Sequence, residues 1–282
     1  MEIWLELKQK NYLLSKAEAE NKLGKIIQEN KPLVKIKTNK QIQNLALTKK
    51  AWQKIDLKKI NTKTFKIDNK PEIITKYAKK IQEKTKAKIK LDNPETTLKI
   101  IEGDIHKLIY KEDKNINKRK AHQKPYQKPT SIDPQLARAM INLTNAKEIT
   151  DPFCGSGGIL IEANIIGIKA KGIDIDQKSL EMAKKNAEHY NLNIELEKAD
   201  STKKKITTEA IVTDLPYGRS SKKTNTIQEL INETLKHDTK KAIICIPKEE
   251  KIIIPKPWTL KQSFEEYIHK SLTRKILDLE IR

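Results

Sequence analysis

Residues 214–217 carry the clearest chemical equipment of the chain: an acid, a leucine, a proline and an aromatic residue directly after a short apolar run. The carboxylate of Asp214 and the backbone carbonyl of Leu215 can accept hydrogen bonds from an exocyclic amine, and the ring of Tyr217 can stack on a planar base. Pro216 lacks an N–H and restricts the local backbone. These groups predict a site that holds a nucleobase amino group toward a reacting partner.

Residues 151–158 have the sequence Asp-Pro-Phe-Cys-Gly-Ser-Gly-Gly and lie between a predicted strand and a predicted helix. Glycines at such a turn let the backbone approach a ligand, and the start of the helix offers free N–H groups. Asp174 ends the next predicted strand about 20 residues on, where an acid can bind ribose hydroxyls. Asp200 ends a third strand and can accept from an adenine amino group. Asp176 is a candidate helix cap, and Asp200 alone is equally compatible with a cap or a turn.

No Walker lysine follows these glycines, which disfavours phosphoryl transfer. A ligand with an adenosine but no pyrophosphate fits better, and S-adenosylmethionine offers a ribose, an adenine and a methionine tail for the strand ends and the glycine turn. Two hydroxyl residues upstream are candidates for the methionine end, although loop and cap chemistry accounts for them equally well. The candidate cofactor-binding residues are Thr130, Ser131, Asp151, Phe153, Gly155, Gly157, Asp174, Ile175, Asp200 and Ser201.

The motifs DPFCGSGG, GIDID, AD and DLPYGR, in this order and spacing, resemble motifs I to IV of class I methyltransferases that methylate exocyclic amines. Residues 122–144 resemble the segment before motif I in the archaeal tRNA guanosine N2-methyltransferases that act at position 10, and DLPYGRSS is similar to that branch's motif IV. Residues 92–100 resemble the Asn-Pro strand turn of THUMP domains, which bind the tRNA acceptor end. The resemblance implies S-adenosyl-L-methionine as cofactor and tRNA as partner.

Guanine N2 is a poor nucleophile because its lone pair is delocalised into the ring. A site for N2 must align it with the electrophilic methyl group and accept its N–H hydrogen bonds, and no side chain needs to deprotonate it first. Asp214 and the Leu215 carbonyl are the candidate acceptors, and Tyr217 is the candidate stacking partner for a base flipped out of a tRNA stem. Leu215 stands where such segments usually carry a second proline, so we expect a softer loop.

Several alternatives stay open at this stage. The Asp-x-Pro-Tyr pattern suits adenine N6 as well as guanine N2, and a guanosine at another tRNA or ribosomal site is a further candidate. A chain with a softened motif IV is also compatible with a catalytically inactive tRNA-binding protein. Whether one or two methyl groups are transferred depends on whether N2-methylguanine can rotate and fit again.

Strand and helix candidates alternate from residue 148 to residue 246, which predicts a doubly wound, mostly parallel sheet. Two long strand candidates, 258–269 and 273–282, predict a closing antiparallel hairpin. Upstream, the periodicity of apolar residues predicts helices at residues 15–30, 41–52 and 71–84 among short strands, which is typical of a small α+β region.

Together with the resemblance, this pattern divides the chain into four parts. We expect a ferredoxin-like part at residues 1–53, a THUMP RNA-binding domain at 54–112, a polar linker at 113–130 and a methyltransferase domain at 131–282. The fold class is then an α/β Rossmann-like class I methyltransferase, whose seven-stranded sheet ends in the antiparallel hairpin, joined to an N-terminal α+β region.

Positive charge is concentrated in the first part of the chain. Residues 1–120 hold 31 basic and 15 acidic side chains, against 27 and 22 in residues 121–282. Such a distribution favours a polyanion-binding domain joined to a nearly balanced one, although genomic bias or a role in solubility is also compatible with a lysine surplus. The candidate RNA-binding residues are Lys118, Arg119, Lys120 and Arg219.

Cys154 and Cys245 are the only cysteines, and neither has the spacing of a zinc site or a disulfide framework, so no metal is expected. No apolar stretch approaches the ~18 residues of a membrane span, and we expect a cytoplasmic protein without a membrane partner. We expect a monomer. Related eukaryotic enzymes use a small zinc-binding partner protein, and the sequence does not exclude one here.

Overall fold

The computed structural model describes residues 1–126, 131–217 and 226–281. Its chain forms two compact units, and neither is continuous in sequence. Unit 1 comprises Met1–Tyr12, Leu23–Gln43 and Leu47–Glu112. Unit 2 comprises Leu13–Lys22, Asn44–Ala46 and Asp113–Arg282.

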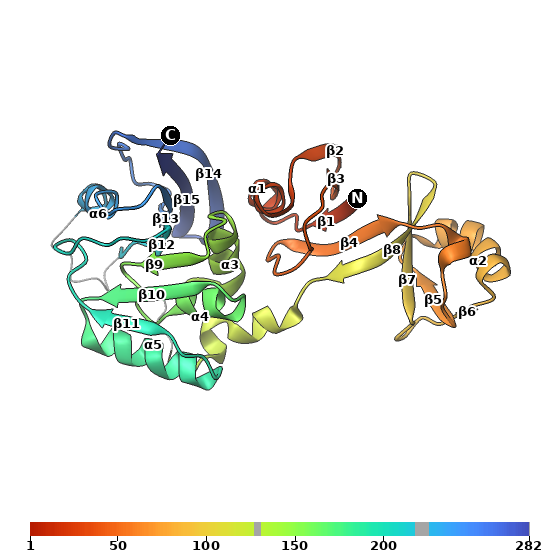
Figure 1. Cartoon of the computed structure of the whole chain (residues 1–282), viewed down its shortest axis with the longest axis horizontal. Helices are drawn as coiled ribbons and strands as arrows, with labels where there is room; N and C mark the ends of the chain where they lie inside the picture. The colour runs from red at the N-terminus through yellow and green to blue at the C-terminus, as the bar shows by residue number, and fades with distance from the viewer. Residues whose placement is uncertain (127–130, 218–225, 282) are drawn as a thin grey trace. The chain divides into compact units, whose positions relative to one another are not determined.

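Unit 1 is built on an eight-stranded sheet, in the order β2-β3-β1-β4-β8-β7-β5-β6 among the described residues (Figure 1). The strands are β1 (Glu2–Leu7), β2 (Ile26–Asn30), β3 (Leu33–Lys37), β4 (Thr48–Lys54), β5 (Thr64–Ile67), β6 (Lys88–Ile89), β7 (Thr96–Ile101) and β8 (Asp104–Lys111). A short 3-10 helix, η1 (Leu57–Lys59), and helix α2 (Pro71–Thr85) belong to the same unit. Ile81 of α2 is buried in one cluster with Phe65 and Leu98, so the helix and its neighbouring strands share a core.

Two of the predicted helices in this region are wrong. The predicted helix 41–52 overlaps β4, whose Trp52 is fully buried and lies opposite Trp4 of β1. Burial between two neighbouring strands outweighs the local helical spacing there. The predicted helix 15–30 ends early, because α1 (Tyr12–Leu23) stops before Gly24, whose φ of +132° suits glycine, and β2 follows.

In unit 2, the residues that the structure describes form a seven-stranded sheet in the order β11-β10-β9-β12-β13-β15-β14 (Figure 1). The strands are β9 (Glu148–Asp151), β10 (Lys169–Asp174), β11 (Glu195–Lys198), β12 (Ala210–Asp214), β13 (Lys241–Pro247), β14 (Trp258–His269) and β15 (Leu272–Ile281). The first five strands in this order, from β11 to β13, pair in parallel, and β15 pairs antiparallel with β13 and β14. The helices are α1, α3 (Pro134–Asn142), α4 (Gly158–Ile165), α5 (Gln177–His189) and α6 (Ile227–Thr234). The predicted parallel sheet with a closing hairpin is confirmed.

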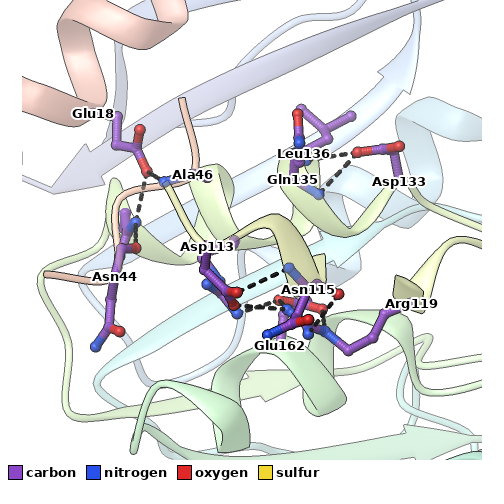
Figure 2. Close-up of polar contacts among 12 residues, drawn as sticks. Glu18, Asn44, Ala46, Asp113, Asn115, Arg119, Asp133, Gln135, Leu136 and Glu162 are labelled. Atoms are coloured by element: carbon purple, nitrogen blue, oxygen red, sulfur yellow. Dashed lines mark hydrogen bonds and ion pairs between the residues drawn. The ribbon is translucent and has the colours of Figure 1, made fainter. Parts of the chain in front are cut away.

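Helix α1 belongs to unit 2, although it lies in the predicted ferredoxin-like part. Its Glu18 is fully buried and accepts a hydrogen bond from the Ala46 N–H at 2.7 Å (Figure 2). The Asn142 side chain donates to the same carboxylate, also at 2.7 Å. Asn142 also donates to the Asn44 carbonyl at 2.9 Å. A buried carboxylate needs such partners, so the segment around Ala46 and helix α1 form part of one polar cluster with the end of α3.

Residues 113–126 were expected to be a linker, but they pack within unit 2. They form two 3-10 helices, η2 (Lys114–Arg119) and η3 (Ala121–Gln123), and Ile116 is buried. Arg119 is 6% exposed and binds Glu162 of α4, its Nε lying 2.6 Å from Oε1 (Figure 2). The segment is therefore held in unit 2 by Ile116 and the Arg119–Glu162 ion pair, while most of its other polar side chains are exposed.

Candidate active site

The amine-binding segment follows β12 at the carboxyl end of the parallel strands. Asp214 lies opposite Cys245 of β13, and the Leu215 N–H donates to the Cys245 carbonyl at 3.0 Å. Leu215 is 1% exposed and packs in the hydrophobic core, against which Phe153 and Tyr217 also pack. Burial and a hydrogen bond that proline cannot make therefore hold Leu215, and both act against the softer loop expected at this position.

Arg274 of β15 binds two of the predicted catalytic residues. Its Nη2 lies 2.8 Å from Asp214 Oδ2, and its Nε donates to the Tyr217 hydroxyl at 2.7 Å. Arg274 is 2% exposed, and its guanidinium carbon lies 5.9 Å from the centre of the Tyr217 ring. Asp214 Oδ1 is also buried and has no well-aligned hydrogen-bond partner among the described residues, although the Cys245 thiol and the Tyr217 hydroxyl lie close enough to the carboxylate to lower its pKa. One acceptor atom is thus available beside a fixed ion pair.

Burial controls the protonation of this cluster. Loss of solvent raises the pKa of Asp214 to about 6, and the guanidinium of Arg274 acts in the opposite direction. The pKa of Tyr217 is raised by burial and by the nearby Asp214. Burial also raises the pKa of the Cys245 thiol. Tyr217 therefore stays a neutral hydroxyl, whereas Asp214 titrates close to neutrality.

Pro216 and Tyr217 are half-buried at the end of this segment. Sequence reasoning missed Arg274, because the residue follows Asp214 by 60 positions. The predicted hairpin was the one available signal: a strand beside β13 brings its side chains toward the end of β12. Arg219, a predicted RNA-binding residue, lies outside the described residues.

The glycine turn contacts the ribose candidate directly. The Gly155 N–H donates to Asp174 Oδ2 at 2.8 Å, and the Asp176 N–H donates to Oδ1 at 2.9 Å. Gly155 and Gly157 have φ values of +52° and +81°, and a Cβ on Gly157 would lie 3.0 Å from that of Ala183. This turn requires glycine at both positions. Each Asp174 oxygen retains a lone pair for a further donor.

Asp151 ends β9, which lies in the sheet between β10, the strand that ends at Asp174, and β12, the strand that ends at Asp214. It is 3% exposed and accepts from the Thr213 hydroxyl at 2.7 Å and from the Phe153 N–H at 3.1 Å. Burial raises the pKa of Asp151 to about 7, and the charges of Asp174 and Asp214 act in the same direction. Three carboxyl groups therefore gather along one edge, which favours a cationic ligand.

The remaining acids at the strand ends also make local contacts. Asp176 caps α5, accepting from the Lys178 N–H at 3.3 Å and the Ser179 hydroxyl at 2.7 Å, as its alternative interpretation predicted. Asp200 accepts from the Thr202 N–H at 3.1 Å and from the Thr202 hydroxyl at 2.6 Å, so its side chain closes a local turn. Ser201 is buried, whereas Ile175 is 67% exposed beside Asp174. An exposed isoleucine at a strand end offers an apolar surface to a planar ring.

The segment before α3 is tied to the glycine turn through Asn186, a fully buried residue of α5. Asn186 accepts from the Tyr126 N–H at 3.0 Å and donates to the carbonyls of Tyr126 at 2.8 Å and Ser156 at 3.1 Å. The Ser131 and Ser156 hydroxyl oxygens are 3.3 Å apart. Sequence reasoning missed Asn186, since nothing in a helical pattern marks which polar residue faces inward. Thr130 lies outside the described residues.

The RNA-binding candidates differ in exposure. Lys118 is exposed and Lys120 is half-buried, so both present charge to solvent. Arg119 is occupied by Glu162, and its assignment to RNA contact is wrong for that reason. In the described part of the chain, no group of three or more acidic, histidine or cysteine side chains could hold a metal ion. No helix within these ranges has the length and apolar character for a membrane crossing.

Residues 121–251 match the family model for an RMKL-like methyltransferase domain. A tRNA (guanine(10)-N2)-dimethyltransferase of Methanothermobacter thermautotrophicus is 30% identical over 220 residues, which cover 71% of this chain and 66% of the relative. The protein of that name from Pyrococcus abyssi is 47% identical over 38% of this chain and 35% of its own length. A probable tRNA (guanine(10)-N2)-dimethyltransferase of Methanothermococcus thermolithotrophicus is 35% identical over 50% of this chain and 95% of the relative.

The chain therefore spans about two thirds or less of the first two relatives, 66% and 35% of their lengths. Two solved structures align with all of this chain at a TM-score of 0.51: TrmN from Thermus thermophilus, with 14% identity, and a possible methylase from Clostridium difficile 630, with 18%. The alignments cover 100% and 98% of those chains. At such identities the likeness concerns the fold alone, and it agrees with the predicted Rossmann-like methyltransferase class.

Proposed function

The chain belongs to the tRNA (guanine(10)-N2)-dimethyltransferase family, and from this premise we propose that it transfers one or two methyl groups to the exocyclic N2 of guanosine 10 in tRNA. The observation that carries the proposal is the buried, unpartnered Asp214 Oδ1 beside the Arg274 ion pair. Such an atom is costly unless a donor reaches it, and an amine N–H is the donor that the substrate brings.

The amine site is proposed to work by orientation. Asp214 Oδ1 and the Leu215 carbonyl accept the two N–H groups of N2, so that the lone pair points toward the cofactor. The Tyr217 ring, held through its hydroxyl, is assigned to stacking on the flipped guanine. Once N2 has been methylated it becomes a strong acid, and Asp214 or solvent takes the proton.

The cofactor side is proposed to bind S-adenosyl-L-methionine, which supplies the electrophilic methyl group. Asp174 accepts from the ribose hydroxyls, and exposed Ile175 packs on the adenine, whose amino group is assigned to Asp200. Asp151 is assigned to the methionine ammonium, because it is a buried carboxyl group at the end of β9 with acids on both sides. The glycine turn and Ser131 complete the methionine end.

The tRNA is proposed to bind through the positive charge of residues 1–120, which include the THUMP-like segment. Exposed Lys118 and half-buried Lys120 would add to this surface from unit 2. Binding through these charges should weaken steeply as the salt concentration rises.

Methyl transfer to an unmodified tRNA transcript tests the proposal. The full chain is incubated with cofactor and transcript, and the digested nucleosides are identified by mass spectrometry. We expect N2-methylguanosine or N2,N2-dimethylguanosine, and neither from a matched transcript in which guanosine 10 is replaced by adenosine. Methyladenosine would exclude the guanine assignment. Tight tRNA binding without any transfer would favour an inactive RNA-binding protein.

A further inference from the structure

Charged and titratable groups surround Asp214 on four elements. Arg274 comes from β15, Cys245 from β13 and Tyr217 from the segment after β12, while Asp151 of β9 exerts a repulsive charge. On the far side of Arg274, Glu266 of β14 lies opposite it in the sheet and adds negative charge at Cys245. Within the described ranges, Arg274 is the cation that acts on Asp214. The carboxylate side chain is 14% exposed and the arginine side chain 3%, so water screens their attraction weakly.

Two hydrogen bonds of Arg274 bind it to the predicted catalytic residues, and both have fixed directions. Nη2 binds one oxygen of Asp214, and Nε binds the phenolic oxygen of Tyr217. A planar guanidinium fixes the angle between two such partners, whereas a lysine ammonium would satisfy the charge without fixing both. The acceptor and the stacking ring are thus tied to one rigid group.

We propose that Arg274 is a positioning residue for the amine acceptor: it occupies Asp214 Oδ2 and leaves Oδ1 as the acceptor for the substrate amine, while holding the Tyr217 ring. The inference rests on the proposed function and deepens it. Without the guanidinium, a buried carboxylate near Asp151 would take up a proton near neutral pH. A protonated Asp214 would present a donor to an amine that itself needs an acceptor.

The test compares Arg274→Met, Arg274→Lys and Tyr217→Phe with the wild-type chain. Arg274 lowers the pKa of Asp214, so its removal should move the acid limb of the kcat profile upward by about 1–3 pH units. At pH 7 we expect kcat to fall by about 100-fold or more for Arg274→Met, with the cofactor Kd unchanged. Arg274→Lys should restore the acid limb but only part of kcat. Tyr217→Phe should move the limb upward less than Arg274→Met does, because the Tyr217 hydroxyl also lowers the pKa of Asp214.

Arg138→Met is the matched control, because Arg138 is also 2% exposed and binds a buried carboxylate, Glu162, at 2.7 Å. Its loss should lower thermal stability without moving the pH profile. A fall in kcat for Arg274→Met that is equal at every pH and matched by Arg138→Met would overturn the proposal. An NMR titration that follows the carboxyl carbon of Asp214 in the wild type and in Arg274→Met needs no tRNA. If the pKa of Asp214 is higher in Arg274→Met but the wild type transfers no methyl group, the methyl-transfer function alone is refuted. If the pKa of Asp214 is the same in both proteins, the positioning role is refuted.

Discussion

The two halves of the strand edge in unit 2 hold their carboxylates in opposite ways. On the cofactor half, Asp174 is half-exposed and accepts from backbone N–H groups of the glycine turn and of Asp176. On the amine half, Asp214 pairs with a buried arginine 60 residues away. Backbone donors come from a turn that the local sequence specifies. The ion pair depends on how the last strand of the sheet is placed.

This difference separates two kinds of chemistry. A ribose brings hydroxyl groups that exchange readily with water, so a half-exposed acid with spare lone pairs is sufficient. An amine that must present its lone pair in one direction needs an acceptor fixed in position, and burial with a charged partner provides it. Substitutions on the two halves should therefore affect different kinetic constants.

The largest effect is expected for Asp214→Asn. The variant keeps the shape of the side chain, but its amide oxygen would turn to Arg274 and present an NH2 group to the substrate amine. We expect kcat to fall by about 100-fold to 1,000-fold, while the Kd for tRNA, measured by filter binding, changes little. Asp278→Asn is the control, since Asp278 is a 1% exposed acid in the same sheet, paired with Lys241. An equal loss of activity in both variants would show that a folding defect causes it.

Asp174→Ala should act on the other half, through binding. Loss of hydrogen bonds to a charged acceptor typically costs about 1.5–3 kcal/mol, so the Kd for cofactor should rise by roughly 10-fold to 150-fold. At saturating cofactor, kcat should stay close to that of the wild type. Isothermal titration with S-adenosylhomocysteine measures the change.

Asp176→Asn serves as the comparison for Asp174→Ala, because Asp176 caps α5 two residues further on. Asparagine is a good N-cap, so both stability and affinity should be nearly preserved. If Asp176→Asn weakened cofactor binding as strongly as Asp174→Ala, the ribose assignment would have to move to Asp176.

A smaller, pH-dependent effect is expected at Asp151, where the two halves meet. Its pKa is raised to about 7, and only the ionised form attracts the methionine ammonium. Cofactor affinity should therefore fall as the pH decreases from 8 to 6, by up to about tenfold. Asp151→Asn should bind weakly with a flat profile. Asp214→Asn should keep the slope, and a flat profile in that variant instead would assign the titration to Asp214.

The same contrast explains what the sequence could predict. The parallel sheet, the glycine turn and the position of Asp174 follow from local patterns, because each turn joins a strand to the helix after it. Arg274 and the tie between Glu18 and Asn142 depend on elements that meet only in the folded chain. Helix α1 likewise belongs to unit 2, and no local pattern within residues 1–53 indicates that placement.

Leu215→Pro gives the smallest expected effect and tests whether the amine half needs a second proline. Proline would remove the N–H that binds the Cys245 carbonyl at 3.0 Å and the side chain that is 1% exposed. The two losses together are worth about 2–4 kcal/mol, which corresponds to a fall in Tm of about 4–16 °C.

Leu215→Ala keeps the N–H but loses more of the buried side chain than proline does, so comparing the two Tm values separates the lost packing from the lost hydrogen bond. Neither variant should raise kcat, because burial already fixes the loop that carries the Leu215 carbonyl. An increase in turnover for Leu215→Pro at unchanged Tm would show that backbone stiffness limits the reaction. The amine half would then depend on local sequence in the same way as the cofactor half.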